Sequence, residues 1–360
     1  MKVVLLAPTP PPNGGIASWT KRMLQASLAD GWEVTVVDEK PLGKRLTFGK
    51  GGSRNFRDEL KRSLRIWKDL RAALSDPEAK VVHSCIPSVT PAMIREYVCA
   101  CITKRAGRKF IMHFRCTVPV TVRGRMGVWI LKKLCRKSDM IFSLNQRSTE
   151  YLTGMTATPV RTIPNFITAE ELAESHEIRD EIKTVLYVGG IVATKGIGEC
   201  LEMAKAFPDI TFRFVGQGDD NFPEVAEELK LSNVTFTGPQ DRPGVMDEMR
   251  RADVFVFLSY FRGEGFSNAL CEAMAAGLPC IVSDWAANAD MIGKEGGAVV
   301  PVKDAGAAIA ALSSMKAQSD RASMSSHNRN KVADQYVESK VLTQYVEAYK
   351  ELTDVSQIDA

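Results

Sequence analysis

Residues 264–284 read EGFSNALCEAMAAGLPCIVSD and combine a turn, a helix and a buried strand in one short run. An apolar strand is expected just before them, at 252–259. A helix is expected to begin near Ser267 or Asn268, and PCIVSD at 279–284 has the composition of a strand. Since unalternating apolar strands separated by helices are typical of parallel sheets covered on both faces, this stretch predicts an α/β fold.

The same alternation runs through the 360 residues, which is long enough for two domains. Strands are predicted at 3–7, 33–38, 80–85, 109–114 and 139–144, and again at 183–190, 210–216, 233–238, 252–259 and 279–284. Helices are predicted at 16–30, 56–75, 91–106, 124–137 and 334–352. We therefore expect two doubly wound Rossmann-like domains, 1–165 and 166–333, with the helix at 334–352 packing back on the first.

Composition excludes several classes of protein. No apolar run approaches the roughly 20 residues that a membrane span needs. The eight cysteines form no CxxC pair and only four histidines are present, so we expect reduced thiols, no metal site and a cytoplasmic location. Residues 1–165 hold 29 Lys and Arg against 12 Asp and Glu, whereas the remainder holds 18 against 31. A basic first half predicts contact with something anionic.

Two predicted strand-to-helix loops have the composition of anion sites. Gly14 and Gly15 precede the first helix, where free backbone N–H groups favour an anion. A plain turn that allows close helix packing is the alternative. Lys195 lies just before Gly196 at the start of another helix, where its ammonium can meet a phosphate. A solvated lysine is the alternative there.

The opening stretch carries two carboxylates eight residues apart. Gly265 lets the backbone approach a ligand closely, and the amides from Phe266 to Leu270 can face a diphosphate. With Glu264 in the turn and Glu272 about one turn into the helix, one glutamate could hold a ribose while the other holds a second sugar. An ordinary loop glutamate and a helix-start glutamate stabilised by the dipole are the alternative. His83 and His113, each at a predicted strand end, are expected to face one cleft, or else to be structural.

The order of these motifs resembles a known enzyme family. The chain has GG near its start, a histidine in the fourth strand, then IPN, VGG…KG, VGQG, TG and the segment 264–284. This order is similar to that of retaining glycosyltransferases of family 4, with the GT-B fold. The resemblance covers nearly the whole chain, and the carboxylate-x7-carboxylate segment is its most specific part. It implies two Rossmann-like domains facing each other across a cleft that holds the nucleotide-sugar.

The resemblance also assigns site residues. It implies Glu264, His113 and Lys195 as catalytic groups, and it implies donor contacts from Gly14, Gly15, Gly190, Arg262, Phe266, Ser267, Asn268, Ala269, Leu270 and Glu272. One departure stands out, because the family usually has an arginine where this chain has Gly190. A charge-assisted hydrogen bond is worth about 1.5–3 kcal/mol, so a substitute is expected. Arg262 is the first candidate, and Arg115 and Arg213 are weaker ones.

The implied function is transfer of a sugar from a UDP- or GDP-linked donor, without cofactor or metal, to an acceptor hydroxyl. The acceptor is expected to be lipid-linked or an oligosaccharide of surface polysaccharide synthesis. Segments 44–71 and 123–137 mix basic and apolar residues, which predicts either peripheral binding to the inner face of an anionic membrane or a solvated basic face. The alternatives are a nucleotide-sugar epimerase and a non-catalytic sugar-nucleotide-binding protein. Nucleic-acid binding is poorly supported, because the aromatic residues do not line a strand.

Overall fold

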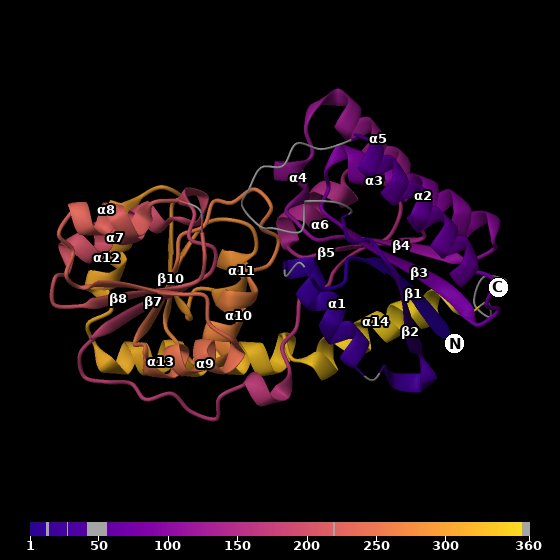
Figure 1. Cartoon of the computed structure of the whole chain (residues 1–360). Helices are drawn as coiled ribbons and strands as arrows, with labels where there is room; N and C mark the ends of the chain where they lie inside the picture. Colours follow the sequence, from indigo (N-terminus) through magenta and orange to yellow (C-terminus); the bar gives the residue numbers. More distant parts are fainter. Residues whose placement is uncertain (12–13, 27, 42–55, 219, 355–360) are drawn as a thin grey trace. The chain divides into compact units, whose positions relative to one another are not determined.

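The computed structural model describes residues 1–11, 14–26, 28–41, 56–218 and 220–354. The chain divides into two compact units (Figure 1). Unit 1 comprises Met1–Asn165 together with the C-terminal segment from Glu338, and unit 2 comprises Phe166–Val337. The two expected doubly wound domains are confirmed, since each unit holds a six-stranded sheet in which every named pair of strands is parallel. The cleft expected between them stays a prediction.

Unit 1 is built on a sheet with the strand order β2-β1-β3-β4-β5-β6. Its strands are β1 (Lys2–Ala7), β2 (Glu33–Asp38), β3 (Ala79–Ile86), β4 (Lys109–Phe114), β5 (Met140–Ser143) and β6 (Val160–Thr162). The helices are α1 (Gly15–Gln25), α2 (Phe56–Ala73), α3 (Thr90–Arg105), α4 (Val118–Thr121), α5 (Gly124–Lys137), α6 (Gln146–Thr153) and α14 (Glu338–Thr353). Figure 1 shows α2, α3 and α5 over one face of this sheet and α1 and α14 over the other. The central strands are buried on both faces, which is why they lack alternation.

Unit 2 repeats the plan with the strand order β12-β11-β10-β7-β8-β9. Its strands are β7 (Thr184–Val188), β8 (Thr211–Val215), β9 (Val234–Gly238), β10 (Val254–Phe257), β11 (Cys280–Ser283) and β12 (Gly297–Val300). The helices are α7 (Ile197–Ala206), α8 (Phe222–Glu228), α9 (Arg242–Arg251), α10 (Asn268–Ala275), α11 (Asn288–Ile292), α12 (Ala305–Ser314) and α13 (Gln318–Gln335). Helices α7, α8 and α12 lie on one side of the sheet and α10 and α11 on the other (Figure 1).

Each sheet has one point at which the strand order reverses. In unit 1 it lies between β1 and β3, and in unit 2 it lies between β7 and β10. Right-handed crossovers send the helices after these two strands to opposite faces, so the loops at their carboxyl ends diverge. Ligands of doubly wound folds bind in the crevice that this divergence leaves. These two positions are therefore where functional residues are expected.

Several predicted boundaries were wrong. The helix predicted at 16–30 ends at Gln25, because the next residue, Ala26, has an extended backbone (φ −73°, ψ 141°). The helix predicted at 334–352 begins at Glu338. Its first predicted residues belong to α13, and Tyr336 leaves helical geometry (φ −121°, ψ 4°) where Val337 bridges to Ile167. The short edge strands β6 and β12 were not predicted.

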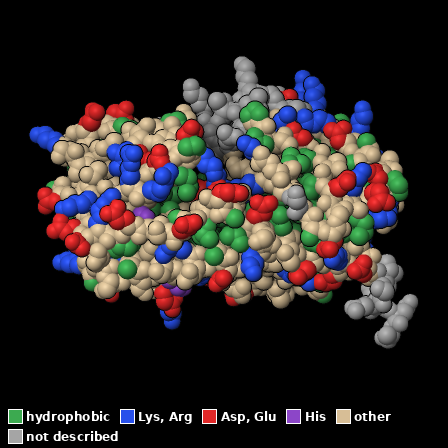
Figure 2. All heavy atoms as spheres, turned by 90° about the horizontal axis from the view of Figure 1, so that it is seen from below, with side chains coloured by type: hydrophobic (Ala, Val, Ile, Leu, Met, Phe, Trp, Pro, Cys, Tyr) green, Lys and Arg blue, Asp and Glu red, His purple; other side chains and the backbone are tan. Residues whose placement is uncertain are grey.

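Charges of both signs intermingle on the face drawn in Figure 2, with hydrophobic side chains in small groups between them. The basic excess of the first half therefore does not form a single-sign surface on this face. Among the helices that the structure describes, none is long and apolar enough to cross a membrane.

Candidate functional site

The loops after β7 and β10 meet at the strand-order reversal of unit 2. The first carries Lys195 in a 3-10 turn (Ala193–Lys195), and Gly196 ends that turn in the left-handed region at φ 81°. A Cβ on Gly196 would lie 2.5 Å from the carbonyl oxygen of Leu258, so only glycine fits there. The amide of Tyr260 donates to the carbonyl of Thr194 over 2.9 Å. The backbone thus holds the lysine loop against the loop that follows β10.

Lys195 and Glu264 form an ion pair across these two loops. Their side chains are 17% and 11% exposed, so both are shielded but reachable. Ser259 Oγ donates to Glu264 Oε2 over 3.4 Å, and the lysine Nζ lies 5.3 Å and 5.0 Å from the ring centroids of Phe257 and Phe261. Such a pair offers an ammonium for an anion and a carboxylate for hydroxyl groups of the same ligand.

Helix α10 begins directly beyond Glu264. Ser267 is its N-cap, and its Oγ accepts a hydrogen bond from the Leu270 amide over 3.2 Å. The Leu270 N–H is thus engaged by the N-cap, and its expected contact with a phosphate stays a prediction. Asn268 and Ala269 are partly exposed at the first turn. The Phe266 ring is buried against Tyr336, with centroids 5.3 Å apart, so this residue anchors the turn in the core.

Glu272 lies one turn into α10 with 16% of its side chain exposed. Arg242, at the start of α9, places Nη2 3.7 Å from Glu272 Oε1 and also pairs with Glu171. Sequence reasoning did not find Arg242, because the loop before α9 contains no motif and only the fold brings it to Glu272. An arginine beside this carboxylate orients it.

Gly190 occupies the position where an arginine was expected. Its φ lies outside the left-handed region, and among the described residues an added Cβ would have only the Gln217 carbonyl oxygen within reach, at 3.9 Å. Nothing in the packing therefore demands glycine. Of the three candidate substitutes, Arg213 donates two hydrogen bonds to Glu248, and Arg115 is buried in unit 1. Arg262 is exposed in the same turn as Glu264.

Gly14 and Gly15 open α1 in unit 1. Gly14 is an extended N-cap without a side-chain hydrogen bond, and the first turn of α1 contains no acidic residue. Gly15 is exposed, and a Cβ added there would meet none of the described residues within 4 Å. The close approach of a ligand to the backbone at this position stays a prediction.

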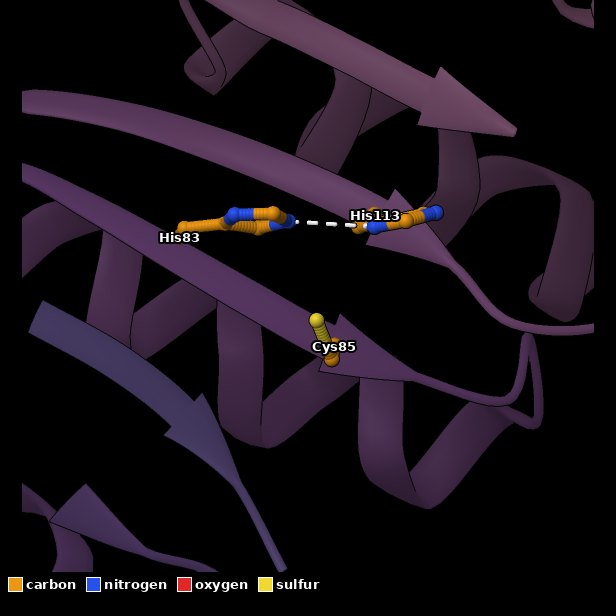
Figure 3. Close-up of side chains that lie close together, drawn as sticks. All are labelled: His83, Cys85 and His113. Carbon is orange, nitrogen blue, oxygen red and sulfur yellow. Dashed lines mark hydrogen bonds between the residues drawn. The ribbon is translucent and has the colours of Figure 1, made fainter. Parts of the chain in front are cut away.

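The predicted histidine pair differs from expectation. Strand β3 continues to Ile86, so His83 is not at its end, and His83 and His113 face each other instead of a cleft (Figure 3). Both are 0% exposed. His83 Nε2 lies 3.0 Å from His113 Nδ1, and His83 Nδ1 lies 2.7 Å from the Tyr349 hydroxyl of α14. The catalytic role of His113 stays a prediction, and it requires access that this burial does not provide.

Arg115 determines the direction of this hydrogen-bond chain. Its Nη1 lies 3.2 Å from His113 Nε2, and a guanidinium can only donate, so that nitrogen carries the lone pair. His113 then donates from Nδ1 to His83, and His83 donates to Tyr349. Burial, reinforced by Arg115, lowers the pKa of His83 to about 3 and that of His113 well below its usual range. Both rings are neutral in the folded chain.

The same chain argues against a metal site. Ligand atoms of His83, Cys85 and His113 lie within 4.8 Å of one another (Figure 3). A metal ion would need lone pairs on both facing nitrogens, but in the assigned tautomers one of them carries a proton. Burial also raises the pKa of the Cys85 thiol, and the Arg115 guanidinium repels a cation. The donor set fits a structural hydrogen-bond chain.

Comparison with known families agrees with the geometry of unit 2. Residues 168–331 match the family described as glycosyl transferases group 1. The matched residues make up less than half of the chain. The match falls within the unit that contains Lys195, Glu264 and Glu272, and over these residues it confirms the resemblance indicated by the motif order.

Curated relatives are similar over part of the chain. A phosphatidyl-myo-inositol mannosyltransferase of Mycolicibacterium smegmatis is 33% identical over 160 residues, which is 42% of this chain and 41% of that protein. The putative glycosyltransferase EpsF of Bacillus subtilis is 34% identical over 142 residues, 35% of this chain and 36% of that protein. The chain thus aligns with less than half the length of each of these relatives.

Solved structures resemble the whole chain. Sucrose-phosphate synthase from Thermosynechococcus elongatus has a TM-score of 0.78 at 17% identity and covers 98% of both chains. HepE of Anabaena in complex with UDP has a TM-score of 0.71 at 15% identity, over 98% of this chain and 100% of that one. At these identities the likeness establishes the fold, and it confirms the expected GT-B architecture.

Proposed function

We propose that this protein transfers a sugar from a nucleoside diphosphate to an acceptor hydroxyl, with retention at the anomeric carbon. The observation that carries the proposal is the Lys195–Glu264 pair at the strand-order reversal of unit 2, beside the start of α10 and Glu272. The match of residues 168–331 to glycosyl transferases group 1 supports the reaction class.

Each residue has a distinct role in this reaction. Glu272, oriented by Arg242, accepts hydrogen bonds from the ribose hydroxyls. Lys195 exchanges its contact with Glu264 for the diphosphate, and Glu264 then accepts hydroxyl groups of the transferred sugar. Negative charge grows on the departing diphosphate, so the ammonium and the first amides of α10 lower the barrier by stabilising it. The departing phosphate oxygen takes the proton of the acceptor hydroxyl.

The donor and acceptor classes rest on the relatives. HepE binds UDP, and the mycobacterial relatives are named for mannosyl transfer to phosphatidyl-myo-inositol. We therefore propose a UDP- or GDP-linked donor, used without a metal, and a lipid-linked or oligosaccharide acceptor in surface polysaccharide synthesis. Arg262 takes the place of the arginine absent at Gly190.

The proposal is tested by measuring nucleotide binding and turnover. Thermal shift with UDP, GDP and their sugar conjugates is expected to single out one nucleotide. Turnover with that donor and a panel of lipid-linked and free saccharides is expected to give a product with retained configuration. Free-sugar release that needs no acceptor would indicate an epimerase, and binding without turnover on any acceptor would indicate a non-catalytic binding protein. Either outcome overturns the proposal.

We also propose that α5 binds an anionic membrane surface. The side chains exposed along this helix are Arg125, Met126, Trp129, Lys132, Lys133 and Arg136. Met126 and Trp129 are 67% and 57% exposed, and Lys133 Nζ lies 5.5 Å from the Trp129 ring centroid. Basic residues that flank exposed apolar ones suit the boundary between lipid headgroups and acyl chains. Part of the other basic segment, 44–71, lies outside the described residues.

Vesicle flotation tests this surface. The chain is expected to float with phosphatidylglycerol vesicles at low salt and to be released at high salt, because exposed charges are screened. Trp129→Ser combined with Met126→Ser is expected to weaken flotation. Leu229→Ser, at an exposed leucine of unit 2, serves as the control. No flotation of the wild-type chain at low salt contradicts the proposal.

A further inference from the structure

A pocket of about 150 Å³ lies at the strand-order reversal of unit 1. Pro8 follows β1, Glu39 follows β2, and Cys85 and Ile86 end β3. Side chains of α1, α2 and α3 complete its wall. The volume corresponds to about five water molecules, which suits a single sugar ring or a similar small group. The pocket has the same topological position in unit 1 that the Lys195–Glu264 pair has in unit 2.

Glu39 is the unusual residue of this pocket. Its side chain is 1% exposed, and its Oε2 accepts a hydrogen bond from Arg95 Nη2 over 3.1 Å. The other oxygen, Oε1, is buried and has no hydrogen-bond partner among the described residues. A buried polar atom without a partner costs about 1–3 kcal/mol, so such atoms are rare unless a ligand or water completes them.

The charges around the pocket balance without a ligand. Arg95 pairs with both Glu39 and Glu96. Arg62 donates to the Glu39 carbonyl through Nε and Nη2 and pairs with Glu59 over 3.4 Å. Both arginines that line the pocket are therefore engaged by acceptors of the chain itself. An anionic ligand would have to compete with these contacts.

Glu39 itself tends to be neutral. Burial raises its pKa to about 8, Arg95 opposes that shift, and the neighbouring Glu96 adds to it. At neutral pH the carboxyl group therefore keeps a proton. Its remaining lone pairs are available to a hydroxyl donor. The rest of the wall is largely apolar, with Pro8, Ile16 and Val89, and suits the C–H faces of a ring.

We infer that this pocket binds a neutral polyhydroxylated ring, a monosaccharide or cyclitol unit of the acceptor, with one of its hydroxyls donating to Glu39. This inference deepens the proposed function and rests on it. It assigns recognition of the acceptor to Glu39 and the wall of the pocket, residues that no motif in the sequence indicates.

Two pairs of variants of the full chain separate this role from packing. Ala92→Leu fills the pocket from α3, and Ala72→Leu on the exposed face of α2 is its control. Glu39→Gln keeps a neutral side chain with an acceptor oxygen, whereas Glu39→Met keeps the approximate volume and removes the acceptor. Retained circular dichroism and nucleotide-induced thermal shift show that each variant is folded.

The probes are glucose, mannose, N-acetylglucosamine and myo-inositol, with inorganic phosphate as the charged comparison, observed by ligand-detected nuclear magnetic resonance. At least one neutral probe is expected to bind the wild-type chain, Glu39→Gln and Ala72→Leu with similar affinity. Binding is expected to be about tenfold weaker in Glu39→Met, because a factor of this size corresponds to one good hydrogen bond or less. A similar weakening is expected in Ala92→Leu, because the larger side chain fills the pocket. The same two variants are expected to raise the KM for the acceptor with little change in the binding of UDP or GDP.

The outcomes distinguish this inference from the function on which it rests. If wild-type chain binds UDP or GDP and turns over, but Ala92→Leu and Glu39→Met bind the probes and the acceptor unchanged, the pocket assignment is overturned alone. Binding of phosphate in preference to every neutral probe also overturns it. If no nucleotide binds the wild-type chain, the proposed glycosyl transfer is overturned. If a neutral probe nevertheless binds the wild-type chain and binds Glu39→Met more weakly, the pocket is still a sugar site, but it serves another function.

Discussion

The strand-order reversals of the two units have the same topology and very different chemistry. In unit 2 the Lys195–Glu264 pair is 17% and 11% exposed, whereas in unit 1 Glu39 and Arg95 are 1% and 6% exposed. Beside them, His83 and His113 are sealed completely. A partly exposed ion pair can exchange one partner for a ligand at little cost, but a buried group must keep its partners or become neutral. The same position in a fold can therefore serve to stabilise charge in one unit and to recognise a neutral group in the other.

The largest effect is expected from the ion pair of unit 2. Lys195→Ala and Glu264→Ala are each expected to reduce turnover by about 100- to 1,000-fold, because charge stabilisation at the departing group is lost. Lys205→Ala and Glu202→Ala, at exposed positions of α7, are the matched controls and should keep wild-type rates. Turnover and thermal unfolding are measured together. Near wild-type turnover in Lys195→Ala or Glu264→Ala would contradict the assignment of these residues to the active site.

The next effect concerns the sealed chain of unit 1. His113→Ala is expected to lower the free energy of unfolding by about 2–4 kcal/mol, since both Arg115 and His83 lose a buried partner. His327→Ala, at a partly exposed histidine of unit 2, should cost less than about 1 kcal/mol. Urea unfolding measures both. An unchanged stability of His113→Ala would show that the ring is not part of a tightly packed network.

The pH dependence of stability sharpens the same contrast. Burial lowers the pKa of His83 to about 3 and that of His113 well below its usual range. In the unfolded chain these rings bind protons below about pH 6.5, but in the folded chain they do not. The stability they contribute is therefore complete above pH 6.5 and falls by about 1 kcal/mol per pH unit for each ring as the pH drops below it.

Urea unfolding between pH 7 and pH 5 compares the wild-type chain with a His83→Gln and His113→Gln double variant. The double variant should show the shallower loss of stability with falling pH. Glu39, whose pKa is raised, acts in the opposite sense, because its contribution is lost as the pH rises towards about 8. Glu39 is present in both proteins. The difference between their slopes of unfolding free energy against pH therefore comes from the two histidines. Equal slopes would contradict the assignment of two neutral rings.

The smallest effect is a gain. Gly190→Arg restores a cation next to the site at a position where an added Cβ meets, among the described residues, only the Gln217 carbonyl oxygen, at 3.9 Å. Donor affinity is expected to increase by less than about tenfold, because Arg262 already supplies part of the charge-assisted hydrogen bonding that an arginine here would add. Isothermal titration with the preferred nucleotide measures it, with Gly198→Arg on α7 as the control. If affinity is unchanged, Arg262 already supplies the full contribution.

Much of the fold was predictable because its causes are local. Buried parallel strands are continuous apolar runs, so ten strands were found, and Ser267 marked the start of α10 through its capping side chain. The missed strands β6 and β12 have only three and four residues and lie at sheet edges, where partial exposure weakens the apolar signal. The break between α13 and α14 was missed because the helical pattern on both sides is continuous in sequence.

The sequence by itself determined the two parallel sheets and the loop that carries Glu264, because periodicity, capping and glycine geometry act over a few residues. Only the tertiary structure decided which side chains are reachable. His83 is sealed by residues as distant in sequence as Trp19 and Tyr349, Glu272 meets Arg242 from another helix, and Glu39 becomes a pocket residue beside Arg95. Burial and charge compensation depend on neighbours brought together by folding, and no local pattern encodes them.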